Sequence, residues 1–248
     1  MKKDFEKAYH EIEMQHFWLR ARRNYILNAL YKADRSSTIL DIGCSSGILL
    51  GQLSQIGFKP ENLYGIDISE KAINNSQKSN LRNTFVMDAQ SIVLNQKFDI
   101  IIASDCLEHL EDDERALRNW SKLLKPQGIA YIFVPAFMSL WSEHDEANMH
   151  FRRYGRSELS EKLKNNGFEV IKSGFWNFFL FMPLYLVRLM SRVKPSKHRE
   201  SGDILRLPPL NNYLFGILNF ENKLLKYINF PFGVSSFAIA KKTSSDNG

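Results

Sequence analysis

The sequence has few cysteines, no long hydrophobic run and no apolar leader. Its only cysteines, Cys44 and Cys106, are too few for the disulfide framework of a small secreted protein or for a structural zinc site. The longest uncharged apolar run, about Phe178 to Val187, is shorter than the ~20 residues that a membrane-spanning helix needs. The first residues, MKKDFEKAYHEIEM, are basic but lack the apolar stretch of a signal peptide. We therefore expect a cytoplasmic protein.

The composition is that of an ordinary globular chain of 248 residues, with 44% hydrophobic and 24% charged residues. These values exclude a disordered chain and a collagen, and they favour one domain with embellishments. The net charge of +6 and the pI near 9.2 suit an anionic partner. Nucleic acid, a phosphorylated substrate and a membrane surface all fit that charge, so it does not choose among them.

Short apolar, β-branched segments alternate with helical segments from residue 38 onward. This alternation predicts parallel βαβ units, and the nearly continuous apolar runs are typical of buried parallel strands. We expect helices within 4–32 and over 112–128, the second stopped by Pro126 and Gly128. The expected strands are 38–43, 62–69, 84–89, 97–104, 129–135, a sixth after Gly167 and a closing strand at 234–242.

Residues 175–232 differ from the rest of the chain, because they are rich in aromatic residues and hold five of the eight prolines. Between Arg188 and Arg206 there are six Lys or Arg residues and two acidic residues, a local charge of +4. One interpretation is a helical cap over a substrate pocket. The other is an interfacial helix whose basic residues meet anionic lipid headgroups. Both stay open at this stage.

The segment DIGCSSG, Asp41 to Gly47, follows a predicted strand and opens a helix. Gly43 and Gly47 allow a tight turn and a close approach of ligand to backbone. A nicotinamide fingerprint needs glycine at 43, 45 and 48, but positions 45 and 48 are Ser45 and Ile48. The phosphate-binding loop of NTPases is also excluded, because no G-K-[ST] follows.

Polar residues stand at the ends of the next three strands: Asp67, Asp88 and the segment Ser104 to His109. The carboxyl ends of consecutive parallel strands line one crevice. Asp67 lies 20 residues after Gly47, where an acid can accept hydrogen bonds from both hydroxyls of a ribose. Asp88 is placed to accept from the exocyclic amine of adenine. The ordered set predicts a nucleoside-binding crevice.

Together, Asp41–Gly47, Asp67, Asp88 and FDIIIASDCLEHL resemble class I S-adenosylmethionine-dependent methyltransferases. The sequence is similar to a bacterial group of these enzymes, the methyltransferase type 11/12-like group. The segments HFWLRARR, HDEANMHFRRYGRSEL and FPFGVSSFAIAKK extend the resemblance over nearly the whole chain. Ser45 departs from it, because the family often has glycine there. We expect Gly43 and Gly47 to preserve cofactor binding.

The resemblance implies an α/β, Rossmann-like, seven-stranded sheet with helices on both faces and an antiparallel last strand. It implies one domain, with a helical lid at 1–35, a cofactor-binding core at 36–174, a helical cap at 175–232 and the last strand at 233–242. The implied cofactor is S-adenosylmethionine, with S-adenosylhomocysteine as product. For Trp18, ordinary helix packing stays open as an alternative. The implied cofactor-binding residues are Trp18 and Arg22 in the lid (with Phe17), and Asp41, Gly43, Cys44, Gly47, Asp67, Ile68, Asp88, Ala89 and Ser104 in the core.

Methyl transfer needs alignment of donor and acceptor, and an oxygen or nitrogen acceptor also needs a base if it carries a proton. Histidine suits that role because it titrates near neutrality. The candidate bases are His109, His144 and His150. The candidate substrate-binding residues are Asp145, Arg152, Arg153 and Tyr154, with a solvated surface as the alternative for the last three. We expect no metal, because His144, Asp145 and His150 have no further strong ligand at helical spacing.

The sequence therefore predicts transfer of a methyl group to an oxygen or nitrogen of a small-molecule, glycan-precursor or lipid-linked substrate. A peripheral contact of 175–199 with the inner face of the membrane stays open, and the oligomeric state is not predicted. An RNA or DNA methyltransferase is an alternative suggested by the charge. It is disfavoured because the fourth strand ends in SDCLEH, unlike base methylases. A non-catalytic cofactor-binding module is the third possibility.

Overall fold

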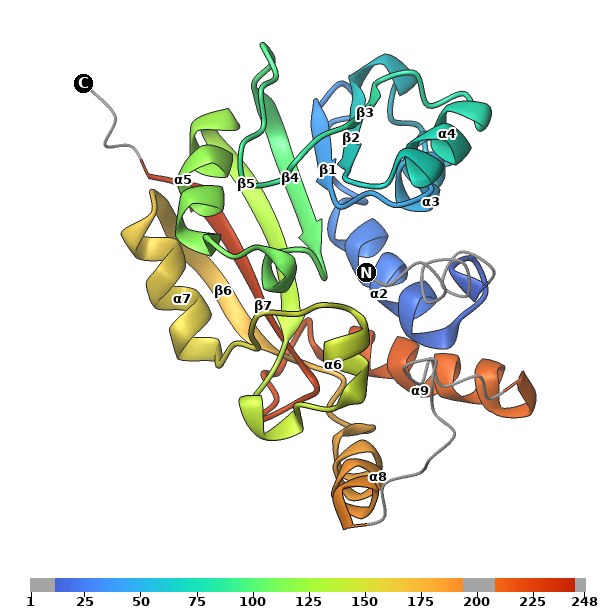
Figure 1. Ribbon diagram of the computed structural model, residues 1–248. Helices are drawn as coiled ribbons and strands as arrows, with labels where there is room; N and C mark the ends of the chain where they lie inside the picture. Colours follow the sequence, from blue (N-terminus) through green and yellow to red (C-terminus); the bar gives the residue numbers. More distant parts are fainter. Residues whose placement is uncertain (1–11, 194–207, 244–248) are drawn as a thin grey trace.

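The computed structural model describes residues 12–193 and 208–243 (Figure 1). The start of the predicted lid, residues 194–206 of the predicted basic stretch 188–206, and the predicted tail at 244–248 lie outside the described residues. No helix in the described ranges combines the length and hydropathy that crossing a bilayer requires.

Seven strands form one sheet in the order β3-β2-β1-β4-β5-β7-β6. β7 is antiparallel to both of its neighbours, β5 and β6, and the other neighbouring strands pair in parallel. The prediction of a Rossmann-like sheet with an antiparallel last strand is confirmed. The strands are β1 (Ile39–Ile42), β2 (Leu63–Asp67), β3 (Thr84–Val86), β4 (Phe98–Ser104), β5 (Leu124–Pro135), β6 (Phe168–Trp176) and β7 (Ser235–Lys242).

Helices cover both faces of the sheet (Figure 1). Alternate strand residues point to opposite faces, so Leu40 and Ile101 pack with α5 and α7, whereas Ile39 and Ile102 pack with α2, α3 and α9. Each face therefore has its own apolar core. The helices are α2 (Phe17–Ala29), α3 (Ile48–Gln55), α4 (Glu70–Lys78), α5 (Asp113–Leu123), α6 (Glu143–Ala147), α7 (Arg156–Asn165), α8 (Phe181–Val193) and α9 (Asn211–Leu224).

The helix predicted over 112–128 is shorter than expected. α5 ends at Leu123, and Leu124 already has extended backbone angles and begins β5. Pro126 explains the early end, because a proline disfavours helical angles at the residue before it and lacks an amide hydrogen. The expected stop signal therefore acts several residues earlier, and the segment joins the sheet.

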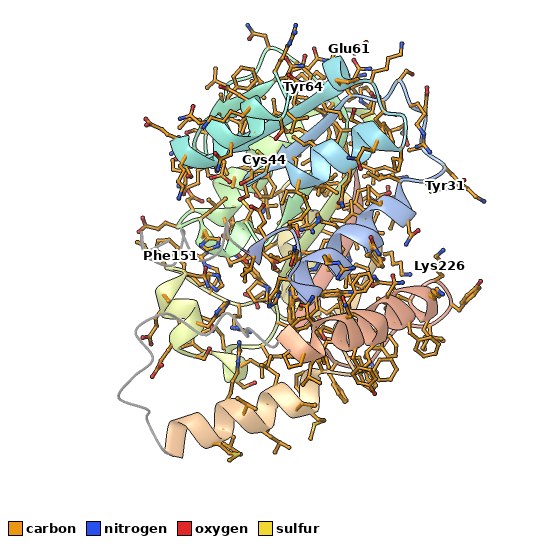
Figure 2. All side chains as sticks on the ribbon, turned by 90° about the vertical axis from the view of Figure 1, so that its right-hand side faces the viewer. Tyr31, Cys44, Glu61, Tyr64, Phe151 and Lys226 are labelled. Atoms are coloured by element: carbon orange, nitrogen blue, oxygen red, sulfur yellow. The ribbon has the colours of Figure 1, made fainter. Side chains whose placement is uncertain are left out.

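Helix α2, in the predicted lid, rests on α9, in the predicted cap, and the two lie side by side (Figures 1 and 2). The backbone amide of Phe17 donates to Asn211 Oδ1 at 2.8 Å, and Asn222 Nδ2 donates to the carbonyl of Ala21 at 2.8 Å. Asn222 also accepts from the indole of Trp176 at the end of β6. Lid, cap and sheet are thus joined by buried hydrogen bonds as well as by apolar packing.

Helix α8 projects from the rest of the described structure (Figure 1). Its base is held by aromatic contacts, in which Phe137 after β5 stacks on Phe175 and meets the edge of Phe181. Much of the remaining apolar surface of α8 is exposed. Exposed apolar patches of this kind are typical of contact sites for another protein or for a membrane. The exposed residues are Met182, Leu186, Val187, Leu189 and Met190.

Candidate functional site

The turn between β1 and α3 is built around two glycines with left-handed backbone angles, Gly43 (φ 76°) and Gly47 (φ 73°). A Cβ on Gly47 would lie 2.5 Å from Leu81 Cδ1, and one on Gly43 would lie 3.2 Å from the side chain of Cys106. The amides of Gly43 and Cys44 both donate to the carbonyl of Ile66, at 2.8 and 2.9 Å. The turn therefore passes tightly over the end of β2, with glycine required at both corners.

Asp67, at the end of β2, fixes the middle of this turn. Its Oδ2 accepts from the amide of Ser45 at 2.9 Å, and its Oδ1 accepts from the amide of Ser69 at 2.9 Å. Ser45 has a φ of 47°. The serine that departs from the family pattern therefore occupies a left-handed conformation, stabilised by the strand-end carboxylate.

Asp41 is buried in β1 beside carboxylates and has no basic partner among the described residues. Burial, and then the charges of Asp67 and Glu13, raise the pKa of Asp41 to about 7. The sulfur of Cys44 is also buried, and burial raises its pKa, so it is a small packing group rather than a thiolate. The crevice thus holds an uncompensated acidic group next to the glycine turn.

The ends of β2 and β3 contribute exposed groups to the same edge of the sheet. The side chain of Ile68, next to Asp67, is 74% exposed, although it is apolar. Asp88 is exposed, and its Oδ1 accepts from the amide of Gln90 at 2.8 Å. The carbonyl of Ala89 accepts from the indole of Trp120, which fixes the loop on the core. The exposed Ile68, with the half-buried Asp67 on one side and the exposed Asp88 at the end of the next strand, suits a flat ring bearing an amine and a ribose.

Lid residue Arg22 reaches the end of β4. Its Nη1 donates to Ser104 Oγ at 3.3 Å and to Asp105 Oδ1 at 3.2 Å, and its guanidinium lies over the rings of Phe133 and Trp176. Trp18 contacts Trp176 edge to face at 5.3 Å. Arg22 is therefore a buried link between lid and sheet, and Trp18 packs on the cap side of that link.

Beyond this link, three side chains converge: Glu108 and His109 from the 3-10 turn after β4, and His150 from the loop after α6. Potential ligand atoms of all three lie within 4.8 Å of one another. The rings of His109 and His150 meet edge to face at a centroid distance of 4.5 Å. Backbone pairing explains the approach, because the amide of Phe151 (labelled in Figure 2) donates to the carbonyl of Glu108 at 2.8 Å.

His150 is oriented by a buried pair. Its Nδ1 lies 2.9 Å from Asp145 Oδ1, and Asp145 also accepts two hydrogen bonds from the guanidinium of Arg153, at 2.7 and 3.0 Å. Arg153 further donates to the carbonyl of Ala136 at the end of β5. Despite burial, the contacts with His150 and Arg153 hold the pKa of Asp145 well below its usual range. The carboxylate therefore stays charged and directs the other ring nitrogen of His150 toward Glu108 and His109.

The pKa values of the neighbouring groups are governed by burial. Burial, with smaller contributions from His150, lowers the pKa of His109 to about 3, and burial lowers that of His144 to about 4. Burial and the nearby Asp105 raise the pKa of Glu108. The imidazoles of His109 and His144 are therefore neutral at physiological pH. The ring of His144 lies 6.4 Å from that of His150, so all three predicted histidines gather in one region.

The predicted substrate-binding residues differ in where they lie. Tyr154 is fully buried and donates to Asp113 Oδ2 at 2.9 Å. Arg152, which is partly exposed, also pairs with Asp113 at 3.0 Å and donates to the carbonyl of Glu111. The contacts of Arg153 and Tyr154 support a positioning role in the scaffold. Arg152 keeps part of its guanidinium surface exposed.

Sequence reasoning missed two features of this site. Glu108 and Asp105 lie in the predicted segment Ser104 to His109 but carry no role of their own in the sequence prediction, although Glu108 joins the cluster and Asp105 pairs with Arg22. The segment SDCLEH marks the first half of the cluster, but its second half, His150, is brought in by a loop. The expectation of no metal rested on spacing within one segment, so it did not consider ligands from two segments.

The residues present fit the implied cofactor, S-adenosylmethionine. The left-handed glycines keep the turn close to the end of β2, and the uncompensated Asp41 suits an ammonium group. The exposed Asp88 and Ile68 suit an adenine ring. These features agree with the assignment of Asp41, Gly43, Gly47, Ile68 and Asp88 to cofactor binding.

In a comparison with protein families, residues 11–173 match the model described as "Methyltransferase domain". Among curated proteins, the chain is 29% identical over 115 residues to the ubiquinone biosynthesis O-methyltransferase of Pelagibacter ubique. That match covers 44% of this chain and 47% of the relative, so the chain spans about half the length of the curated relative it matches.

Solved structures share the fold. A SAM-dependent methyltransferase from Archaeoglobus fulgidus superposes with a TM-score of 0.59 and 20% identity, covering 95% of this chain and 99% of that one. The N-methyltransferase NodS from Bradyrhizobium japonicum, solved with S-adenosylhomocysteine, gives a TM-score of 0.53 and 19% identity. It covers 66% of this chain and 81% of that one. At this identity the similarity concerns the fold.

Proposed function

The chain belongs to the methyltransferase-domain family, whose model spans residues 11–173, and from this premise we propose that it transfers a methyl group from S-adenosylmethionine to a small acceptor. The observation that carries the proposal is the arrangement of residues at the carboxyl ends of β1 and β2. There the turn from Gly43 to Gly47 adjoins the buried, uncompensated Asp41 and the strand-end Asp67. This arrangement supports binding of a cationic nucleoside.

When bound, S-adenosylmethionine supplies a methyl group already activated by its sulfonium. The chain's own task is then to position the acceptor and to manage its proton. In our proposal Asp41 and the glycine turn hold the methionine part, Asp67 the ribose, and Asp88, Ala89 and Ile68 the adenine. Cys44 and Ser104 would border the reacting end, with Arg22 and Trp18 above it.

The acceptor would enter beside Glu108, His109 and His150, where the ends of β4 and β5 meet the cap. We assign the loss of the acceptor's proton to this cluster, with His144 adjoining it. An oxygen acceptor is favoured over nitrogen, because the curated relatives carry the name O-methyltransferase. Asp145, Arg153 and Tyr154 would hold the cluster in place, and Arg152 keeps surface for an anionic acceptor group.

The exposed apolar surface of α8 supports a lipid-linked acceptor as the finer proposal. Five large apolar residues on this helix are exposed, and Arg188 and Arg192 add positive charge in the same segment. An interfacial helix combines these properties. In this proposal α8 rests on an anionic membrane surface and presents the acceptor to the cluster below the cap.

Calorimetry with S-adenosylhomocysteine tests the cofactor site. Asp67→Ala should weaken binding by at least about 10-fold, since it removes a charged hydrogen-bond acceptor at the ribose position. The exposed Glu61→Ala, in the turn before the amino end of β2 (labelled in Figure 2), is the control and should leave affinity unchanged. Equal affinity in wild type and Asp67→Ala would remove Asp67 from the site.

Flotation with vesicles of anionic or neutral lipid tests the α8 proposal. The full chain should float with anionic vesicles in a salt-sensitive manner, and Leu186→Glu together with Met190→Glu should abolish flotation. Val93→Glu, at an equally exposed apolar residue outside α8, should float like wild type. Flotation that is unaffected by the α8 changes would leave α8 as a pocket cap only.

A further inference from the structure

The cluster of Glu108, His109 and His150 contains the donor set of a transition-metal site. It offers one carboxylate and two imidazoles, from two segments 41 residues apart in sequence. Two imidazoles and a carboxylate form a facial set that leaves coordination positions open, and such sets bind Zn²⁺ or neighbouring divalent ions.

Glu108 is the first argument for a cation. It is 0% exposed, and within the described part of the chain neither of its carboxylate oxygens has a hydrogen-bond partner on another residue. The two nearby guanidinium groups are engaged elsewhere, Arg22 with Asp105 and Arg153 with Asp145. Protonation would not satisfy this carboxyl group, because its hydroxyl would still lack an acceptor. A bound cation would satisfy it.

The orientation of the imidazoles is the second argument. Metal-bound histidines usually give their other ring nitrogen to a carboxylate or a backbone carbonyl. His150 Nδ1 lies 2.9 Å from the buried Asp145, which leaves Nε2 for the cluster. The ring of His109 is hydrogen-bonded to the backbone of Asn148. Both rings are therefore held in the manner of metal ligands before any ion binds.

The distances fit after a modest adjustment. Ligands about 2.1 Å from an ion lie about 3.0 Å apart in a facial octahedral set and about 3.4 Å apart in a tetrahedral set. The atoms here lie within 4.8 Å of one another, so a shift of up to about 0.8 Å per side chain, within reach of rotations of the side chains, would close the site. The geometry points to a divalent transition-metal site, of the Zn²⁺ class, formed by Glu108, His109 and His150.

This inference deepens the proposed function and rests on it for the ion's role. An ion here would bind the acceptor's hydroxyl oxygen in an open position and lower its pKa, so that the proton passes to solvent. The methyl group then leaves sulfur for that oxygen, and the electron pair of the broken carbon–sulfur bond stays on sulfur. The acceptor class is thereby narrowed to hydroxyl compounds able to reach a metal ion.

Metal titration of the full chain, after treatment with EDTA, tests the site without measuring activity. We expect calorimetry to detect a single Zn²⁺ site per chain, and Co²⁺ to give visible absorption bands of a coordinated ion. Glu108→Gln and His150→Gln should each weaken Zn²⁺ binding by at least about 10-fold. Glu146→Gln, an exposed carboxylate on the adjoining helix α6, is the matched control and should bind like wild type.

The outcomes separate this inference from the cofactor proposal. No Zn²⁺ binding by wild type, or equal binding by all three variants, would overturn the metal site even if S-adenosylhomocysteine still binds. Loss of S-adenosylhomocysteine binding with retained Zn²⁺ binding would overturn the proposed cofactor site alone. If circular dichroism shows that the cluster variants do not fold, imidazole NMR of wild type decides. Zn²⁺ must shift the resonances of His109 and His150, and unchanged resonances would refute the site.

Discussion

The guanidinium of Arg22, on the lid helix α2, pairs with the carboxylate of Asp105 at the end of β4, with Nη1 3.2 Å from Oδ1. Asp105 has a φ of 54°, a left-handed conformation that costs a non-glycine residue of order 1 kcal/mol or more. Its amide donates to the carbonyl of Phe133, which helps to hold that conformation. The pair therefore joins the lid to a strained corner of the crevice.

Replacing Arg22 by methionine should lower the free energy of unfolding by about 2 kcal/mol, because hydrogen bonds from a buried guanidinium are lost. The hydroxyl of the buried Ser235 would lose its donor, 2.9 Å away. Urea unfolding would measure the change. Arg20→Met, on the same helix with its guanidinium over Phe215, is the control and should cost less. Equal losses would show that the link to the sheet carries no special stability.

The pKa of Asp41, raised to about 7, predicts a dependence of stability on pH. Because this pKa is higher in the folded than in the unfolded chain, the protonated group favours folding at acid pH. That contribution is lost as pH rises toward 7 and beyond. The burial of the ionised group then costs up to about 4 kcal/mol. Asp41→Asn should therefore be more stable than wild type at pH 8, with a smaller difference at pH 5, in urea unfolding at both values.

The same group predicts proton release when the cofactor product binds. An ammonium group next to Asp41 favours the ionised carboxylate, so affinity for S-adenosylhomocysteine should rise about 10-fold between pH 6 and pH 8. Calorimetry near pH 7 in two buffers of different ionisation enthalpy would detect the released proton. Asp41→Asn should abolish the release, and an unchanged release in that variant would assign the proton to another group.

The sheet was predictable because its signals are local. Strands such as Ile39–Ile42 are short apolar runs. Such a strand, and an acid at a strand end such as Asp67, can be recognised without knowing which distant residues they contact. The early end of α5 was not predicted. Pro126 disfavours helical backbone angles at the residue before it, and the segment from Leu124 onward pairs with β4 as part of the sheet. Local patterns therefore gave the order of elements better than their ends.

The cluster was only half predictable, because it depends on the path of a loop. Nothing in SDCLEH indicates that His150 lies beside Glu108; the contact follows from the backbone bond between Phe151 and Glu108. Arg153 and Tyr154 illustrate the reverse case. Their charge and hydroxyl suggested substrate contact, whereas their buried partners, Asp145 and Asp113, emerge only in the folded chain.

Tyr154→Phe distinguishes a positioning role from substrate binding. The hydroxyl of Tyr154 donates to the largely buried Asp113, which also pairs with Lys162, so its loss should lower the free energy of unfolding by about 1–2 kcal/mol. Affinity for S-adenosylhomocysteine should stay unchanged. Once an acceptor is known, its KM should also be unaffected, whereas a raised KM at normal stability would restore Tyr154 to the substrate site.

Two glycines four residues apart, Gly47 and Gly51, offer the sharpest test of the turn. Gly47 has a φ of 73°, and a Cβ there would lie 2.5 Å from Leu81 Cδ1 and 2.9 Å from Ser76 Cβ. Gly51, inside α3, has nothing within 4 Å of an added Cβ.

Gly47→Ala should therefore lower the free energy of unfolding by about 1–3 kcal/mol and weaken S-adenosylhomocysteine binding. Gly51→Ala should raise stability by up to about 1 kcal/mol with binding unchanged, because alanine favours a helix. Urea unfolding and calorimetry on both variants measure these effects, and tight binding by Gly47→Ala would show that the cofactor does not depend on this turn.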